Sequence, residues 1–375
     1  MNFALFTTLE NILGTNLTHI ATILAMVVAT VLPLIIVAYG GMISEHSGIV
    51  NLSLEGNMIF GAMAGFLVCR ALTPLDADGR MIDPTVCSIN PILAAIIAAL
   101  VAGLVGLLSS LLLAFAAINL KANQTLIGTA INVLAAAAAI AVVHIMTGSN
   151  GELGIDTKIT APEWLNITGK TFGMDAKYFD ITSVENPTGW QYLASFFSIF
   201  VFNTTFVSHF IIIILIIAVV IFMKKTKIGL RLEACGENPQ ACDSVGVSVT
   251  KIRYLGTCLS GFLAGIGGFA FVSMLGIFAA NNGVFGFGFL ALAVMMGGGW
   301  KPGVIIGSGL VFAIFRVLAN YTWIQDIMFP KTEFAGIKDV FFMVPYIVTL
   351  IILIFASRRS NCPKAEGIPY EKGAR

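Results

Sequence analysis

The sequence has few charged residues. Of 375 residues, 21 are Lys or Arg and 20 are Asp or Glu, so charged residues make up 11% of the chain and the formal net charge is +1. A soluble domain carries about 25% charged residues. Hydrophobic residues make up 57%, and they form many separate runs long enough to cross about 30 Å of hydrocarbon. We therefore expect an integral membrane protein.

Several patterns of enzymes and of nucleic-acid-binding and metal-binding proteins are also missing. No basic patch is interleaved with aromatic residues, so nucleic acid is not an expected partner. The six cysteines contain no CxxC pair and the four histidines are scattered, so we expect no metal site. No catalytic cluster or cofactor is expected. The GxxxxGK[ST] phosphate loop is absent, so ATP would have to be bound by a partner protein.

Two cysteines leave one question open. Cys69 and Cys87 flank a loop that we place outside the membrane, where an oxidising periplasm would allow them to pair. Free thiols are nevertheless the expected state of all six cysteines.

Glycine and proline occur inside the apolar runs, which favours an all-α polytopic transmembrane helical bundle over a β-barrel. We expect about 8–10 spans, including broken or re-entrant helices. The orientation of the N-terminus stays open. The expected crossings, of which the first contains Pro33 as a kink, are 16–39, 91–119, 125–146, 196–223, 254–278, 284–300, 304–319 and 340–356.

The chain is expected to form one transmembrane domain over residues 1–357, followed by a mobile cytoplasmic tail at 358–375. The tail is basic at its start, and basic residues near span ends stay in the cytoplasm. The longest hydrophilic stretch, 147–194, is placed outside. So long a loop is usually functional, as a lid or a docking surface, although plain loop variation explains it too.

Residues 224–253 form a basic, polar segment between two apolar runs, which we place in the cytoplasm. Gly229 and Gly236 are expected to break the chain, and Asn238 and Pro239 to start a short helix. A short helix held beneath the bilayer would suit transmission of force from a partner. A solvated connecting loop accounts for the same pattern equally well.

A second polar stretch, 40–70, lies among apolar residues. Polar groups at membrane depth usually face a cavity, so they are candidates for a substrate path. A carboxylate near a helix N-terminus at the membrane interface is the alternative for Glu45 and Glu55. Asn132, in a later span, could face substrate or bond to a neighbouring helix. The candidates on these two stretches are Asn51, Ser53, Glu55, Asn57 and Asn132.

Three segments carry a resemblance to one family. The segment GLRLEACGENPQACDSVGV resembles G-L-R-x-x-A-x-G-E-N-P-x-A-A-x-x-x-G-I, but Cys235 and Cys242 stand where small residues such as Ala are usual and Gln240 where a basic residue is common. SEHSGIVNLSLEG resembles S-E-R-S-G-x-x-N-I-x-L-E-G with His46 for Arg and Leu52 for Ile. GFGFLALAVMMGGGWKPG resembles a third, glycine-rich motif. The chain thus resembles permease subunits of ABC importers for branched-chain amino acids, monosaccharides and nucleosides, nearest the nucleoside and simple-sugar branch.

The resemblance implies roles for particular residues. It places Asn51 and Glu55 at a broken helix on the translocation path. Phe285, Phe287 and Phe289 could stack a flat substrate ring, or pack against lipid or core. The residues that the resemblance assigns to ATPase coupling are Arg231, Gly236, Glu237, Asn238, Pro239 and Gly246.

The expected function is that of a permease subunit in an ATP-driven importer of the bacterial inner membrane. Neutral polar and aromatic candidates fit a neutral solute, with a nucleoside first and a sugar or flavin-like molecule next. The implied partners are an ABC ATPase subunit, a second permease (identical or related) and an external substrate-binding protein. The alternative is an ion-gradient-driven secondary transporter, which would need acid or His relays deep in several spans.

Overall fold

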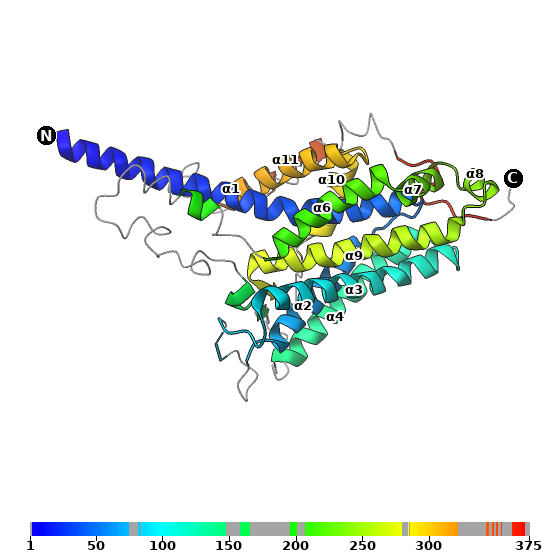
Figure 1. Ribbon diagram of the computed structural model, residues 1–375, viewed down its shortest axis with the longest axis horizontal. Coiled ribbons are helices and arrows are strands. Elements are labelled where there is room, and N and C mark those ends of the chain that lie inside the picture. Colours follow the sequence, from blue (N-terminus) through cyan, green and yellow to red (C-terminus); the bar gives the residue numbers. More distant parts are fainter. Residues whose placement is uncertain are drawn as a thin grey trace. The chain divides into compact units, whose positions relative to one another are not determined.

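The computed structural model is mostly helical (Figure 1). It describes residues 2–74, 82–83, 85–147, 158–165, 196–200, 207–279, 284, 286–321, 343–344, 347–348, 350–351, 354 and 362–371. The chain divides into two compact units, the first formed by Met1–Val31, Asn166–Phe206 and Leu310–Val348, the second by Leu32–Leu165, Val207–Gly309 and Thr349–Arg375. All contacts of the candidate site described below lie within the second unit.

Six helices among the described residues are long and apolar enough to cross a membrane, which confirms the all-α, polytopic prediction. The total of 8–10 spans stays a prediction, because the expected crossing at 340–356 lies largely outside the described residues. The six helices are α1 (Asn2–His46, with its apolar span at Leu17–His46), α3 (Pro91–Ile118), α4 (Gln124–Thr147), α6 (Val207–Lys225), α9 (Val249–Leu275) and α11 (Pro302–Asn320).

The bounds differ from the sequence-based expectation at several places. The expected crossing at 284–300 contains only the 11-residue helix α10 (Phe287–Gly297), which is not among the six. The helix α1 continues through Pro33 and beyond the expected end at 39 as far as His46. The polar stretch that follows is not one span, because a turn at 47–53 separates α1 from α2 (Leu54–Ala71). Whether α2 is a re-entrant helix stays a prediction.

The centre of the second unit is α9, against which α2, α3 and α6 pack. Glycines allow this close packing. A Cβ atom at Gly106 would lie 2.3 Å from the carbonyl oxygen of Gly261, and one at Gly268 would lie 2.2 Å from that of Met58. Both distances are far below contact distance, so only glycine permits these approaches of helix to helix.

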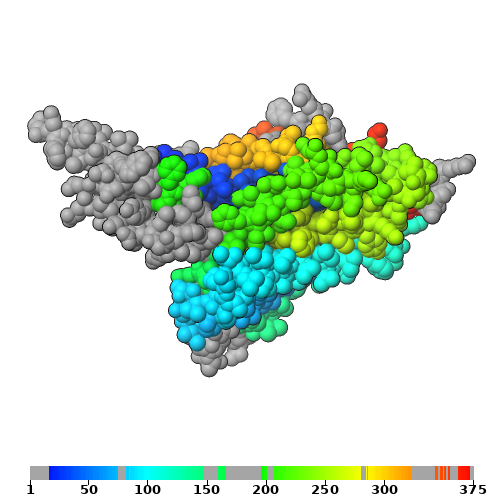
Figure 2. All heavy atoms as spheres, viewed as in Figure 1, coloured from blue at the N-terminus to red at the C-terminus, as the bar shows by residue number. Residues whose placement is uncertain are grey.

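The outer face of α3 is apolar and exposed. Leu100, Leu104 and Leu108 follow one another at helical spacing and are about half exposed. The cyan spheres of this helix are visible at the surface in Figure 2. A face of this kind suits contact with lipid or with another membrane chain.

One strand pair joins the far end of α9 to the expected external segment. β1 (Lys158–Thr160) runs antiparallel to β2 (Ile277–Ala279), with Ile159 opposite Phe278. The short helix η1 (Glu163–Leu165) follows, and the Trp164 indole N–H donates to the Thr73 hydroxyl at 3.0 Å. The rest of 147–194 lies outside the described residues.

Candidate functional site

The segment between α6 and α9 forms two helices that we call the coupling arm, α7 (Lys227–Glu237) and α8 (Pro239–Ser244). Asn238 separates them, and its side-chain oxygen accepts a hydrogen bond of 3.0 Å from the Ala241 N–H. Pro239 occupies the first helical position, where a missing N–H costs no helix bond. The short helix predicted from Asn238 and Pro239 is thus present.

Gly229 and Gly236 do not break the chain as predicted. Both lie inside α7, in its first and last turns. Their small size is used for contact instead: a Cβ atom at Gly236 would lie 2.3 Å from the carbonyl oxygen of His46 at the end of α1. Gly246 has φ of +83° just beyond α8, where glycine avoids the strain that other residues would meet.

The coupling arm presents most of its motif residues outward. Arg231, Glu237, Asn238 and Gly246 are exposed, Pro239 is half-buried and Gly236 is buried. The two helices are held together underneath by Cys235, Cys242 and Val249, which form a small apolar core with Val247, Ile252 and Tyr370. The arm is therefore a packed unit whose surface exposes these polar motif residues together with apolar Leu230 and Val245.

Residues 362–371 lie against this arm and are named here the C-terminal strap. The Ala365 N–H donates to the Gly236 carbonyl at 2.8 Å, and the Gly367 N–H donates to the Gly48 carbonyl at 3.2 Å. The expectation of a mobile tail is therefore wrong for these residues, because backbone hydrogen bonds fix them to α7 and to the turn after α1.

Two side chains fasten the strap further. Arg253 of α9 is 1% exposed and donates through Nη1 to the Ile368 carbonyl at 2.9 Å. Lys121 forms an exposed salt bridge of 2.5 Å with Glu371. Solvent screens an exposed ion pair, so the buried guanidinium and the backbone bonds are the main anchors.

The substrate-path candidates of the turn at 47–53 are fully buried and bonded to one another. The Asn51 amide donates to Ser260 of α9 at 2.8 Å, and its oxygen accepts from the N–H (3.0 Å) and hydroxyl (2.6 Å) of Ser53. The Asn57 oxygen accepts from Ser109 of α3 at 2.7 Å. Since buried polar groups are costly unless paired, this network ties the turn to α3 and α9.

Glu55 lies at the start of α2 and bonds to another helix. Its two carboxylate oxygens accept hydrogen bonds from the backbone N–H groups of Gly286 (2.9 Å) and Gly288 (2.6 Å) at the start of α10 (Phe287–Gly297). A carboxylate is favoured at a helix N-terminus, where N–H groups lack partners. The N-termini of α2 and α10 are joined in this way.

Asn132 of α4 bonds to the same region. Its oxygen accepts from the Gly56 N–H at 2.7 Å and its amide donates to the Leu52 carbonyl at 2.9 Å. Of the two uses expected for this residue, the bond to a neighbouring helix is the one that the structure contains.

The phenylalanine candidates do not share one surface. Phe287 is fully buried, and its ring stacks on that of Phe271 with centroids 3.9 Å apart. Phe289 is 49% exposed, and Phe285 lies outside the described residues. A role for these rings in binding a solute stays a prediction.

Sequence reasoning missed three features of the site. The Trp300 indole donates a hydrogen bond to the Glu45 carboxylate at 2.5 Å. Arg253 donates one to the strap, and Ser260 accepts one from the Asn51 amide. In the sequence, Arg253 is the last residue of the basic segment 224–253. Its signal in the sequence is weak, because a basic residue at a cytoplasmic helix end normally lies in solvent.

All six cysteines are free in the structure, so Cys69 and Cys87 are not paired. Among the residues that the structure describes, no group of three or more His, Cys, Asp or Glu side chains could hold a metal ion.

Comparison with known proteins identifies the family. Residues 23–357 match the family model described as branched-chain amino acid transport system, permease component. The chain is 33% identical over 366 residues to the guanosine ABC transporter permease protein NupQ of Bacillus subtilis, covering 95% of this chain and 99% of that one. It is 30% identical over 363 residues to the nucleoside ABC transporter permease protein NupC of Lactococcus lactis, covering 94% and 99%.

A more distant relative is the putative glucose ABC transporter permease protein TsgC13 of Haloferax volcanii, which is 22% identical over 339 residues, covering 88% of this chain and 89% of that one. No solved structure matches the chain. These findings confirm a multi-pass membrane protein that is a transport subunit and not an enzyme. The chain belongs to the family of permease components of the branched-chain amino acid transport system type, as an ABC transporter permease.

Proposed function

We propose that this chain forms the translocation path of an ATP-driven nucleoside importer, and that the ATPase subunit acts on it through the coupling arm. The observation that carries the choice of solute is the similarity over nearly the whole chain to two permeases named for guanosine and nucleosides, at 33% and 30% identity. A simple sugar is the second candidate solute, on the weaker similarity at 22% identity to a putative glucose permease.

The contacts of the coupling arm support a route for force. Movement of α8 reaches α7 through their shared core and then α1 through the close approach of Gly236 to His46. The next residues are the turn at 47–53, which Asn51 ties to α9 through Ser260. A push on the arm would therefore act on the break between α1 and α2.

The route continues beyond the turn. α2 begins at Leu54, and Glu55 in its first turn holds the start of α10. Displacement of the turn would move the N-termini of both short helices together. Paired short or interrupted helices near the midplane are the usual place of solute binding in transporters, so this junction is where we place alternating access.

Copurification tests the proposal. The tagged chain is purified from membranes, and ATP hydrolysis by the copurified subunits is measured with an external binding protein and a panel of nucleosides, sugars and amino acids. Stimulation by nucleosides supports the full proposal, and stimulation by sugars alone overturns the solute. A chain that binds no ATPase and transports on an ion gradient overturns the coupling role.

A further inference from the structure

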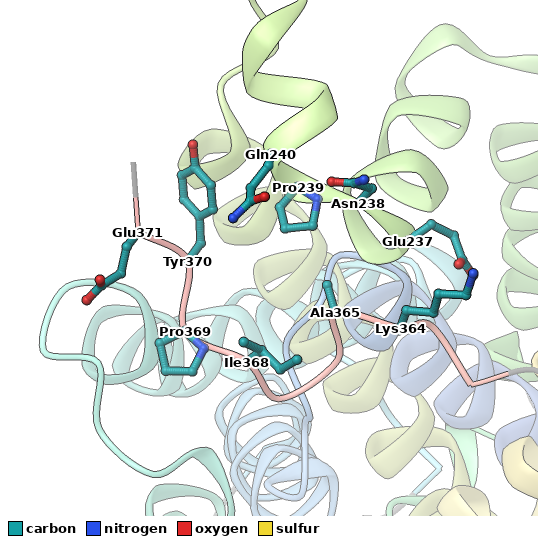
Figure 3. Close-up of a pocket in the computed structure, with 10 residues that line it drawn as sticks. All are labelled: Glu237, Asn238, Pro239, Gln240, Lys364, Ala365, Ile368, Pro369, Tyr370 and Glu371. Atoms are coloured by element: carbon teal, nitrogen blue, oxygen red, sulfur yellow. The ribbon is translucent and has the colours of Figure 1, made fainter. Parts of the chain in front are cut away.

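The C-terminal strap and residues 237–240 of the coupling arm line an open pocket of about 410 Å³. Figure 3 shows the side chains of Glu237 to Gln240 along one side and those of the strap along the other. The strap residues of the lining are Lys364, Ala365, Ile368, Pro369, Tyr370 and Glu371.

The position of the strap is set by the site itself. The Ala365 N–H bonds to Gly236, the residue that touches the end of α1, and Ile368 is bound through its carbonyl by the buried Arg253. Tyr370 also packs on the apolar core beneath α7 and α8. The strap therefore follows the arm as a fixed second wall.

The chemistry of the pocket indicates what would occupy it. Ile368 is a large apolar side chain in the pocket lining and is 57% exposed. Pro239 and Pro369 also line the pocket, while exposed Glu237 and Lys364 lie together at one end (Figure 3). This arrangement fits a protein segment that inserts an apolar side chain and presents polar groups beside it, as interface centres and rims do.

We infer that the pocket between α8 and the strap receives a protruding segment of the ATPase subunit, so that the strap is the second half of the ATPase docking surface. The inference rests on the proposed function, because it takes α8 to be the element on which the ATPase acts. The new element is that the strap, more than a hundred positions after α8 in the sequence, also contacts the ATPase subunit. The strap then both binds the ATPase and passes its movement to Gly236, Gly48 and Arg253.

The test changes the pocket without changing the anchors. Ile368→Asp places a charge in the pocket, while the Ile368 carbonyl that Arg253 binds is a backbone group and is retained. Ile368→Val is the matched control, because it keeps an apolar side chain at the same place. The dissociation constant between each purified chain and the ATPase subunit that copurifies with the wild-type chain is measured in detergent, and protease resistance of a C-terminal tag reports whether the strap stays in place.

A minority of residues near the centre of an interface carry most of the affinity, and loss of one of them weakens binding tenfold or more. We expect Ile368→Asp to weaken ATPase binding roughly tenfold and Ile368→Val to leave it unchanged, with equal protease resistance. Equal affinity of all three chains would overturn the inference while leaving the proposed function standing. If the wild-type chain binds no ATPase subunit, both are overturned.

A second variant covers the case in which Ile368→Asp loosens the strap. Lys364→Glu reverses a charge at the exposed end of the pocket, with Lys364→Arg as its control. Weaker ATPase binding by the Glu variant alone would support the strap as a docking wall. The inference is overturned if Lys364→Glu binds the ATPase as the wild-type chain does while the strap of Ile368→Asp becomes sensitive to protease. The strap would then only stabilise the coupling arm.

Discussion

The Glu55 carboxylate accepts a hydrogen bond of 2.6 Å from the backbone N–H of Gly288. The two residues are 233 positions apart and lie at the starts of α2 and α10. There is no room for a side chain at Gly288, because a Cβ atom there would lie 2.5 Å from the Glu55 Cα atom. A carboxylate that the sequence suggests for solute binding thus serves, in this conformation, to join two short helices.

Removal of this carboxylate should loosen the junction. A hydrogen bond to a charged group is worth about 1.5–3 kcal/mol, so Glu55→Ala, which loses two, should lower the free energy of unfolding by about 3 kcal/mol or more. Glu55→Gln retains an acceptor and should lose less. Thermal unfolding of the purified variants in detergent measures both. A stable Glu55→Ala chain that has lost only solute binding would contradict the joining role and favour direct contact with solute.

Asn132 should behave as a structural bridge. Asn132→Ala leaves the Gly56 N–H and the Leu52 carbonyl without their side-chain partner, which should cost about 1–3 kcal/mol for each group. Asn132→Asp should rescue little, because a carboxylate cannot donate to the Leu52 carbonyl. The neighbouring Val133→Ala, at a residue that is 71% exposed, is the control. Melting temperatures of the three variants test this, and an unchanged Asn132→Ala would count against it.

Gly236→Ala should uncouple the permease. The added Cβ atom would meet the His46 carbonyl at 2.3 Å, so α7 and the end of α1 must separate. We expect ATP hydrolysis to persist while solute-dependent stimulation falls roughly tenfold or more, a change of about 1.4 kcal/mol in coupling. Gly307→Ala is the matched control, since nothing lies within 4 Å of its added atom. Normal stimulation in Gly236→Ala vesicles would refute the route through this contact.

The strap should loosen as pH rises. Burial raises the pKa of Glu366 above its ordinary value of 4.5, against a smaller opposing effect of the Cys362 thiol. The Glu45 carboxylate also interacts with Glu366. Because the pKa is raised in the packed state, the protonated form favours packing, and this contribution is present at low pH and is lost as pH rises through the raised pKa.

Protease trimming of a C-terminal tag measures strap release. We expect the wild-type rate to increase from acidic to alkaline pH relative to Glu366→Gln, which stays neutral and serves as the control at each pH for the protease itself. Parallel pH profiles for the two chains would mean that Glu366 ionisation does not act on the strap.

Much of the fold could be predicted from the sequence. The apolar runs locate most of the long helices, because hydrocarbon imposes both length and composition. Asn238 and Pro239 mark the start of α8 because the side chain and the ring act on the local backbone alone. Local signals of this kind need no knowledge of distant contacts.

The contacts between distant segments could not be predicted in the same way. Asn51 and Glu55 read as polar residues at membrane depth, and only the placement of Ser260 and Gly288 shows that partners for these groups come from other helices. Gly236 reads as a break, whereas its use is the approach to His46. The strap carries no strong periodicity, and its position depends on Arg253, which is buried only in the folded protein.

The most direct test of the account is uptake by vesicles that contain the chain together with its ATPase subunit and binding protein. Labelled guanosine, glucose or leucine is supplied together with ATP on the membrane side that carries the ATPase subunit. In a second experiment each solute is supplied with an ion gradient and no ATP. The account predicts ATP-dependent accumulation of guanosine above the other two solutes and no accumulation on the gradient alone. Accumulation driven by the gradient without ATP would contradict it.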